Sequence, residues 1–433
     1  MGDPLNRTPS PPLPPPSPFV PRPSSPSPRP SSLSPRPSSL SPHPSSLAPP
    51  PSSLVPRPSS LAPRPSSLLF LAPLALAGAL LAAQNTNVVI GLLLPPEEPE
   101  AASLRRGALL AVEDANRAPA PKVRLVVRGR TGQWGADAEE AARMVLDDGA
   151  QALIAPPGGA ATHLALQVAG RTAVPVVTLC PDSSVSRTGV PWMVRLAPAT
   201  LEEAKSLLAG LNVGGTGPQR WTALVPDGRA GREVSRDLRQ AAAAARRKLW
   251  NTHQVSPTLT NFQSIVTQVL EDRPDAVLVW LDPGRAGTLA KGLREAGFAG
   301  RLAGPSRCDS PAFFAASGLA AEGFFVPAIV LDKAGRARLL AFRTAFRRRY
   351  GLEADLTAAE AYDAATLLAR ILGKNDPQSL PRAFPLSFAL PGVSGELSFD
   401  AEGNRRLALR LLVARQGRFC AADAPGAAQS LSP

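Results

Sequence analysis

The sequence is poor in the residue types that build most catalytic and metal sites. Its 433 residues include three histidines, three cysteines and two tyrosines. Cys180, Cys308 and Cys420 are too few and too widely spaced for a zinc cluster or a disulfide framework, so we expect free thiols. No histidine has a serine or cysteine and an acid at a spacing typical of a nucleophilic triad. We therefore expect no enzyme activity, no metal and no cofactor.

Acidic residues are outnumbered, yet the basic surplus does not indicate a nucleic-acid partner. The formal net charge is +13, but six arginines and one acid precede residue 84, so the remainder carries about +8. Basic groups such as Arg246, Arg247 and Lys248 have no aromatic residues between them. Nucleic-acid surfaces usually cluster their charge and add stacking rings. We expect a solvated basic surface and no nucleic acid.

No apolar run is long enough to predict a membrane-spanning helix. The longest run, Leu68–Ala83, has 16 residues, whereas a spanning helix needs about 20. It contains Pro73 and Gly78, follows a basic stretch without acids, and ends in small residues. This pattern predicts a signal peptide at 68–83, cleaved near Ala83, and hence export to the periplasm. An uncleaved anchor and a buried core segment remain alternatives.

Proline, in contrast, is abundant and concentrated before the apolar run. Six copies of a seven-residue unit close to SPRPSSL fill residues 27–68. Proline cannot continue a helix, so residues 1–67 are expected to form a disordered or polyproline-like arm. A signal peptide normally begins near the start of its chain. We therefore hypothesise a translation start at a non-Met codon, at Val55, Leu61 or Leu68.

Beyond residue 87 the pattern changes to alternating strands and helices. Strands are predicted at 87–94, 122–127, 151–156, 175–179, 221–228, 276–284 and 301–306, with helices between them. A helix through Lys248, a helix at 359–372 and a hairpin at 394–404 complete the pattern, and His253 is assigned to a polar connector. The alternation predicts an α/β fold with parallel sheets flanked by helices.

Several of these stretches together resemble the type I periplasmic binding-protein family, in particular its leucine/isoleucine/valine-binding branch. The stretches are IGLLLP (90–95), RRGALLAVEDAN (105–116), ALIAPPGGAAT (152–162), PVVTLCP (175–181), FQSIVTQVLEDRPDAV (262–277), LREAGFAG (293–300), AEAYDAA (359–365) and GVSGELSFDAEGN (392–404). The resemblance covers about residues 87–420. It implies two Rossmann-like lobes that are joined by three strands and close over a ligand.

The resemblance also implies where the lobes and the binding loops lie. Lobe 1 is expected at 84–197 and 327–391, lobe 2 at 198–326 and 392–424, and a tail at 425–433. Parallel sheets present binding loops at the carboxyl ends of their strands. The expected ligand-binding residues on these loops are Glu100, Gly158, Gly159, Ala160, Ala161, Thr162, Cys180, Asp182, Ser183, Asp227, Ala230, Asp282 and Ser306.

These loops depart from the family pattern. Glu100, Ala230 and Asp282 stand where the family often has tyrosine, and Ser306 stands where an acid is common. Gly158 and Gly159 still allow backbone amides at a helix start to face an anion. Turn formation, helix capping and solvent exposure are alternative explanations for several of these residues, among them Asp182, Asp227, Asp282 and the acids at 97–100.

The family implies a periplasmic, monomeric solute-binding protein that delivers a small molecule to the membrane permease of an ABC transporter. The expected ligand is an amino acid or a related small polar or carboxylate compound. The alternative is a periplasmic interaction protein of the same fold, such as an activator of penicillin-binding proteins or a sensor domain. The missing tyrosines favour this alternative, and the glycine loop favours the solute-binding protein.

Overall fold

The computed structural model describes residues 87–422, except for 118, 120, 131–134, 213–216 and 374–388. The predicted arm at 1–67, the predicted signal peptide at 68–83 and the tail at 425–433 lie outside the described residues. No helix in the described part of the chain is long and apolar enough to span a bilayer.

Lobe 1 is built on a five-stranded parallel sheet with the strand order β2-β1-β3-β4-β5. Its strands are β1 (Val88–Leu93), β2 (Val123–Arg128), β3 (Ala152–Ala155), β4 (Val176–Thr178) and β5 (Met193–Arg195). All six residues of β1 are buried, because the strand lies in the interior of the sheet with helices on both faces. The predicted strand at 87–94 is therefore confirmed.

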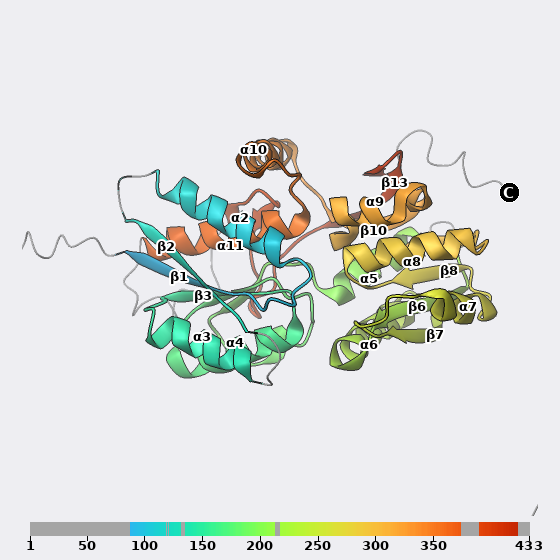
Figure 1. Ribbon diagram of the computed structural model, residues 1–433, viewed down its shortest axis with the longest axis horizontal. Coiled ribbons are helices and arrows are strands. Elements are labelled where there is room, and N and C mark those ends of the chain that lie inside the picture. Colours follow the sequence, from blue (N-terminus) through green and yellow to red (C-terminus); the bar gives the residue numbers. More distant parts are fainter. Residues whose placement is uncertain are drawn as a thin grey trace, which may run out of the picture. The chain divides into compact units, whose positions relative to one another are not determined.

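Helices cover both faces of this sheet (Figure 1). The helices α2 (Ala101–Ala115) and α11 (Leu356–Leu372) pack on one face, around Ile90 and Ile154. The helices α3 (Ala136–Leu146) and α4 (Gly159–Thr172) pack on the other face, around Val89 and Leu153. The alternation of core residues along β1 follows from the two-residue period of a strand.

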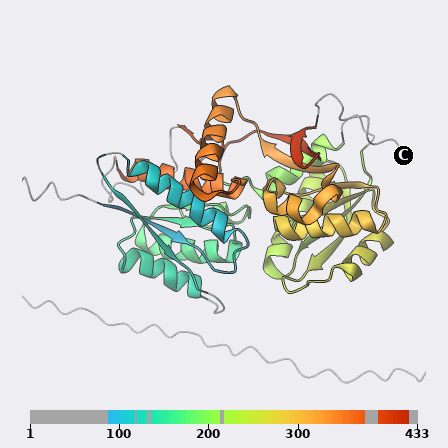
Figure 2. The ribbon, with the colours of Figure 1, turned by 45° about the horizontal axis from the view of Figure 1, so that its top comes forward.

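A third helix layer lies outside α2 and α11. The helix α10 (Lys333–Tyr350) is seen as a separate ribbon in Figure 2. Its Phe342 and Phe346 pack against Leu110 of α2 and Ala358 of α11. Beneath this layer α2 and α11 approach closely, since a Cβ atom on Gly107 would lie 2.1 Å from the Ala358 carbonyl oxygen. Glycine at this position therefore sets the spacing of the two helices.

Lobe 2 is built on a seven-stranded mixed sheet with the order β14-β13-β10-β9-β8-β6-β7. The pairs β10–β13 and β13–β14 are antiparallel, and the other pairs are parallel. Its strands are β6 (Arg220–Pro226), β7 (Lys248–Val255), β8 (Ala276–Val279), β9 (Arg301–Ala303), β10 (Phe324–Ile329), β13 (Leu409–Arg415) and β14 (Arg418–Ala421).

The helices of lobe 2 also form two layers. The helices α7 (Gln263–Glu271), α8 (Pro283–Glu295) and α9 (Pro311–Ser317) share one core with Val277 and Val279 of β8. The helices α5 (Thr200–Gly210) and α6 (Gly228–Ala244) share the other core with Leu278 and Trp280. The 3₁₀ helices η3 (Ser306–Cys308) and η4 (Gly318–Ala321) lie in connecting segments of lobe 2, and η1 (Val185–Arg187) lies between β4 and β5 of lobe 1.

Within the residues that the structure describes, the chain passes between the two sheets three times, as the resemblance implied. The crossings lie at 196–199 between β5 and α5, at 330–332 between β10 and α10, and at 406–408 before β13. The predicted lobe boundaries need two corrections. β10 pairs with β13 as far as Ile329, so lobe 2 extends past residue 326. The small hairpin β11 (Leu390–Pro391) and β12 (Glu396–Leu397) packs Leu397 and Phe399 into the core of lobe 1, not lobe 2.

The sequence analysis predicted none of the lobe 2 strands β7, β10, β13 and β14. The segment 248–255, expected as a helix end and a polar connector, forms β7 and carries His253. β7 pairs only with β6 in the described sheet and is largely exposed. A polar edge strand has neither a continuous apolar run nor a clean alternation, so hydrophobic patterning could not indicate it.

Candidate ligand-binding cleft

A cavity of about 460 Å³ lies between the loops of the two lobes, and we call it the cleft. It has the size expected for a small-molecule site. Lobe 1 contributes the loop 95–100, Asp137 and the start of α4, and lobe 2 contributes the starts of α5, α6, α8 and η3. The cleft therefore lies at the carboxyl ends of parallel strands, as the sequence analysis predicted.

The start of α4 faces a carboxylate of the protein itself. The Gly158 backbone N–H donates a hydrogen bond to Glu98 Oε2 at 3.1 Å. The contact is close, because a Cβ atom on Gly158 would lie 2.9 Å from the same oxygen. Burial raises the pKa of Glu98 to about 7, and the neighbouring Glu100 carboxylate adds to the rise. The anion position that the glycine loop offers is thus occupied by Glu98.

Arg307 connects the two lobes through four hydrogen-bond acceptors in lobe 1. Its Nη1 atom donates to Glu100 Oε2 at 2.9 Å and to Thr357 Oγ1 at 2.5 Å. Its Nη2 atom donates to the Leu179 carbonyl at 2.9 Å and to Glu360 Oε2 at 3.2 Å. Burial lowers the pKa of Arg307, but Glu100 and Glu360 outweigh this effect and keep its pKa above the ordinary value.

A second buried carboxylate lies on the lobe 2 side of the cleft. Glu203 Oε1 accepts hydrogen bonds from the Ser306 backbone N–H at 3.2 Å and from the Ser306 hydroxyl. Burial raises the pKa of Glu203 to about 7, although Ser306 and Arg307 both act to lower it. Glu203 therefore holds η3, and with it Arg307, against the start of α5.

The Asp182–Ser184 loop contacts lobe 2 outside the cleft. Ser183 Oγ donates to Asp237 Oδ2 at 2.6 Å, and Asp237 lies on α6. Burial raises the pKa of Asp182, but hydrogen bonds with His163 and Ser184 outweigh it and hold the pKa at about 2. Asp182 is thus engaged by its own loop and by His163 of α4, and Ser183 joins the lobes directly.

The structure brings eight of the thirteen predicted site residues together in the cleft. They are Glu100, Gly158, Gly159, Ala160, Ala161, Ala230, Asp282 and Ser306. Five predicted residues, Thr162, Cys180, Asp182, Ser183 and Asp227, do not line it.

The reasons differ from residue to residue. Thr162 is buried and donates to the Pro156 carbonyl. Cys180 is buried beneath α4, and burial raises the pKa of its thiol to about 12. Asp227 is the N-terminal flanking residue of α6. Cys180, Cys308 and Cys420 are all free thiols, as expected.

The sequence analysis missed Glu98, Glu203, Trp280 and Arg307 as cleft residues. Solvent exposure was an alternative explanation for the acids at 97–100, and it holds for Glu97 but not for Glu98. Glu98 is partly buried because Gly158, 60 residues later in the chain and just before α4, lies beside it. Arg307 follows the predicted Ser306, so the loop was predicted but its cation was not. Glu100 and Glu360 were the available signal for a cation in the cleft, because carboxylates that become buried need a positively charged or hydrogen-bonding partner.

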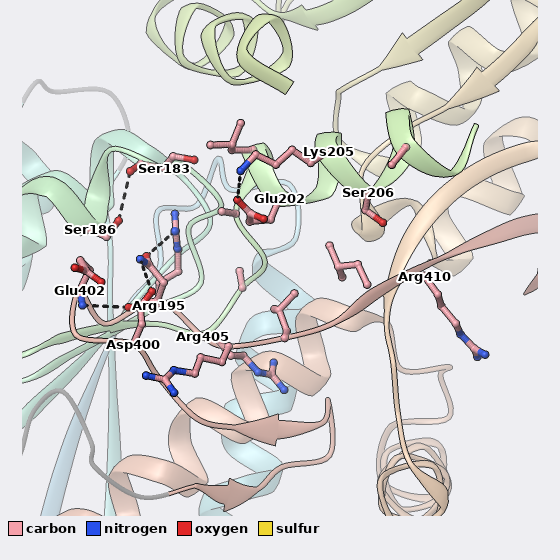
Figure 3. A pocket seen from close by; sticks show the side chains of 18 of the residues that line it. Ser183, Ser186, Arg195, Glu202, Lys205, Ser206, Asp400, Glu402, Arg405 and Arg410 are labelled. Carbon is pink, nitrogen blue, oxygen red and sulfur yellow. Dashed lines mark hydrogen bonds and ion pairs between the residues drawn. The ribbon is translucent and has the colours of Figure 1, made fainter. Parts of the chain in front are cut away.

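A second cavity of about 940 Å³ lies beside the crossings at 196–199 and 406–408 (Figure 3). Its polar side chains bond mainly to one another. Arg195 Nη2 donates to Asn404 Oδ1 at 2.6 Å, and Lys205 Nζ donates to Glu202 Oε1 at 2.8 Å. Of the predicted binding loops it includes only Ser183. The cleft therefore remains the stronger candidate for a ligand.

Metal binding receives no support from the described side chains. Across 87–422, apart from the gaps, no group of three or more histidines, cysteines and acids could hold a metal ion. Three carboxylates of the cleft, Glu98, Glu100 and Glu203, are bonded to backbone, arginine or serine groups. The groups of the cleft that are available to contact a ligand are therefore its hydrogen-bonding, charged and apolar side chains and backbone atoms.

Two α/β lobes, three crossings and a cleft at the strand ends define a bilobal binding protein. The chain belongs to the periplasmic binding protein family, whose model matches residues 87–410. The family consists of binding proteins, which agrees with the expectation of a non-catalytic role. No curated protein sequence matches the chain.

Solved structures of the same fold include binding proteins for quite different solutes. The branched-chain amino acid transporter substrate-binding protein LivJ from Streptococcus pneumoniae, in complex with isoleucine, is similar with a TM-score of 0.69 and 18% identity, over 77% of this chain and 98% of that one. A solute-binding protein from R. palustris in complex with benzoate has a TM-score of 0.69 and 18% identity, over 77% and 95%. The leucine-binding protein LivK from Thermotoga maritima has a TM-score of 0.67 and 18% identity, over 77% of this chain and 97% of that one. At these identities the likeness establishes the fold.

Proposed function

We propose that this protein is the solute-binding component of an ABC transporter and holds a small organic molecule in the cleft. The observation that carries the proposal is the cleft itself, which is built at the strand ends of both lobes and bridged by Arg307. The bound isoleucine and benzoate of the similar structures support a solute of this size. The starting candidates are amino acids and related small polar or carboxylate compounds.

The contacts between the lobes suggest how binding would be coupled to transport. Arg307 and Ser183 form hydrogen bonds across the lobes, so the arrangement described here has its own stabilising contacts. A ligand that touches both lobes adds to these contacts and shifts the population toward this arrangement. A membrane permease would then recognise the ligand-loaded form. We place this cycle in the periplasm, consistent with the family and the predicted signal peptide.

A thermal-shift screen of the full-length chain tests the proposal. The panel contains amino acids, amides, short carboxylates, aromatic acids and amines. A ligand at 100 times its dissociation constant adds about 2.7 kcal/mol to the free energy of unfolding, which raises the midpoint by several degrees. We expect at least one compound class to give this shift. A flat response across the panel would contradict a solute-binding role.

One observation favours the alternative of an interaction protein of the same fold, such as a penicillin-binding-protein activator or sensor domain. Glu98 already occupies the start of α4, and Arg307 already has four acceptors, so parts of the cleft are satisfied without a ligand. In that case no solute would stabilise the protein, and a cell-wall enzyme would be retained on the immobilised chain. The same screen, paired with such a pull-down, separates the two functions.

A further inference from the structure

We propose that the cleft selects solutes carrying a positively charged amine on an apolar body, and disfavours solutes whose only charged group is a carboxylate. This inference rests on the proposed solute-binding function and narrows the class of ligand. Three features of the cleft carry it: the position of Glu98, the engagement of both cleft arginines, and the excess of carboxylates over cations in the lining.

Glu98 is placed where a ligand carboxylate would otherwise bind. Its Oε2 atom accepts the Gly158 N–H at 3.1 Å, at the N-terminal end of the 14-residue helix α4. A second carboxylate approaching the same helix end would lie beside Glu98 and be repelled by it. An ammonium group at this position is attracted by Glu98, whose raised pKa reflects a negative charge that burial disfavours.

Both arginines of the cleft already have partners within the protein. Arg307 donates to two carboxylates, a hydroxyl and a carbonyl of lobe 1. Arg285 donates to the Ser256 carbonyl, and its guanidinium lies 5.6 Å from the ring centre of Phe262. A carboxylate ligand would have to displace a partner of Arg307 or share Arg285 with Ser256 and Phe262, and an amine would not.

The lining reverses the charge balance of the chain. The sequence has 47 basic and 34 acidic residues, yet six carboxylates and two guanidinium groups line the cleft. Asp137 is one of the six, and its Oδ1 atom is buried without a hydrogen-bond partner among the described residues. The carboxylates are Glu97, Glu98, Glu100, Asp137, Glu203 and Asp282. A local excess of acid in a basic protein attracts a cation to this cleft specifically.

The walls between the charged groups are apolar. Eight prolines line the cleft, together with Val234, Trp280 and Leu281. Proline and aliphatic carbons provide no polar hydrogen atoms, so this part of the cavity fits a hydrocarbon group. The expected ligand therefore combines an ammonium group near Glu98 with an alkyl or aryl body against these walls.

Matched pairs of compounds test the charge preference by calorimetry on the full-length chain at pH 8. Isopentylamine and 4-methylpentanoate share one hydrocarbon body, and benzylamine and phenylacetate share another. Leucine and phenylalanine carry both charged groups on similar bodies. In low salt, we expect the amine of each pair to bind at least tenfold more tightly than its carboxylate.

Two variants separate the charge of Glu98 from its position. Glu98→Gln keeps a carbonyl oxygen for the Gly158 N–H but loses the charge, so amine affinity should fall about tenfold while carboxylates stay weak. Glu98→Ala also leaves the Gly158 backbone N–H without its acceptor, so carboxylate affinity should rise about tenfold. Glu295→Gln is the control, because Glu295 is exposed on α8 and does not line the cleft, so its loss should change affinity less than twofold.

The outcomes distinguish the inference from the function on which it rests. Carboxylates that bind the wild type as tightly as the matched amines would overturn the inference and leave the solute-binding function intact. Amine affinity that is unchanged in both Glu98 variants would also overturn it. If no compound of any charge binds the wild type or the variants, both the function and the inference fail.

Discussion

Arg307 of lobe 2 donates a hydrogen bond to Glu360, a residue of lobe 1 whose side chain is 0% exposed, with 3.2 Å between Nη2 and Oε2. A carboxylate buried so completely requires a partner, and this partner comes from the other lobe. The pair therefore couples the stability of α11 to the position of η3. Since Arg307 also donates to Glu100 of the cleft, the arrangement of the lobes and the charge of the cleft depend on one side chain.

We expect Arg307→Met to lower the free energy of unfolding by about 3–5 kcal/mol at pH 8, because it leaves the Glu360 carboxylate buried without its cation. Urea unfolding measures the loss. Adding Glu360→Gln should restore much of it, since the second change removes the uncompensated charge. Arg349→Met is the control, because Arg349 pairs with Glu113 on the exposed surface and should cost less than about 1 kcal/mol. Equal losses in the two single variants would contradict this account.

The raised pKa of Glu203 predicts a stability effect that depends on pH. An acid whose pKa rises on folding, from 4.5 to about 7, stabilises the native state most when protonated. Its contribution is present below about pH 4.5 and is lost as the pH rises through 7. Glu203→Gln removes the ionisation and retains an oxygen that accepts from Ser306. We expect the variant to match the wild type near pH 4.5 and to be more stable by about 1–3 kcal/mol at pH 8.

Urea titrations of both proteins between pH 4.5 and pH 8 measure this difference. A difference that stays constant across the range would mean that the ionisation of Glu203 does not differ between the folded and unfolded states. A variant that becomes less stable as the pH rises would show that the carboxylate charge is favourable in its buried position.

Ser183→Ala is expected to loosen the contact between the lobes. It removes the 2.6 Å hydrogen bond to Asp237, a charged acceptor that is 2% exposed. Such bonds contribute about 1.5–3 kcal/mol, so the population with separated lobes should increase. Small-angle scattering of the ligand-free protein would then give a larger radius of gyration.

A matched control lies within lobe 1. Ser103 Oγ also donates to an aspartate, Asp355 Oδ2, at 2.6 Å, but this bond does not cross between the lobes. Ser103→Ala should therefore leave the radius of gyration unchanged. If both alanine variants scatter like the wild type, the Ser183–Asp237 bond does not hold the lobes together.

The spacing of α2 and α11 is expected to depend on Gly107. A Cβ atom there would lie 2.1 Å from the Ala358 carbonyl oxygen, so Gly107→Ala must push the helices apart. Overpacking of this kind costs about 1–3 kcal/mol and also displaces the helices that carry Glu360 and follow Glu100. Thermal unfolding measures the effect.

Gly170→Ala is the control for this substitution. Gly170 also lies in a helix, but its nearest heavy atom to a new Cβ would be 3.8 Å away, on Val190. Because alanine favours helices more than glycine does, Gly170→Ala should be neutral or stabilising by up to about 1 kcal/mol. Similar losses in both variants would show that the helix contact is not the cause.

Much of the fold could be predicted because its local signals agree with its tertiary structure. The apolar run at 87–94 forms the fully buried β1. The first residues of the strands predicted at 276–284 and 301–306 form β8 and β9. β7 could not be predicted in this way, since an exposed edge strand needs no apolar pattern. A hairpin was predicted at 394–404, whereas the structure forms it at 390–397, and its lobe depends on where Leu397 and Phe399 pack, which local patterning does not determine.

The cleft was predicted less completely, for a related reason. The loops were predicted from the carboxyl ends of the strands, and Gly158, Ala230, Asp282 and Ser306 on these loops line the cavity. The charged groups that define its chemistry depend on contacts between distant segments. Arg307 meets a carbonyl 128 residues away and a carboxylate 207 residues away. No periodicity in the sequence records such pairings.

The most direct test of the solute-binding cleft compares two tryptophan substitutions on α6. Ala230 and Ala243 are both exposed on this helix, but only Ala230 lines the cleft. Calorimetric titration of each variant with the tightest ligand of the screen should show binding abolished by Ala230→Trp and unchanged by Ala243→Trp. Full-affinity binding by Ala230→Trp would contradict the claim that the solute is held between the lobes.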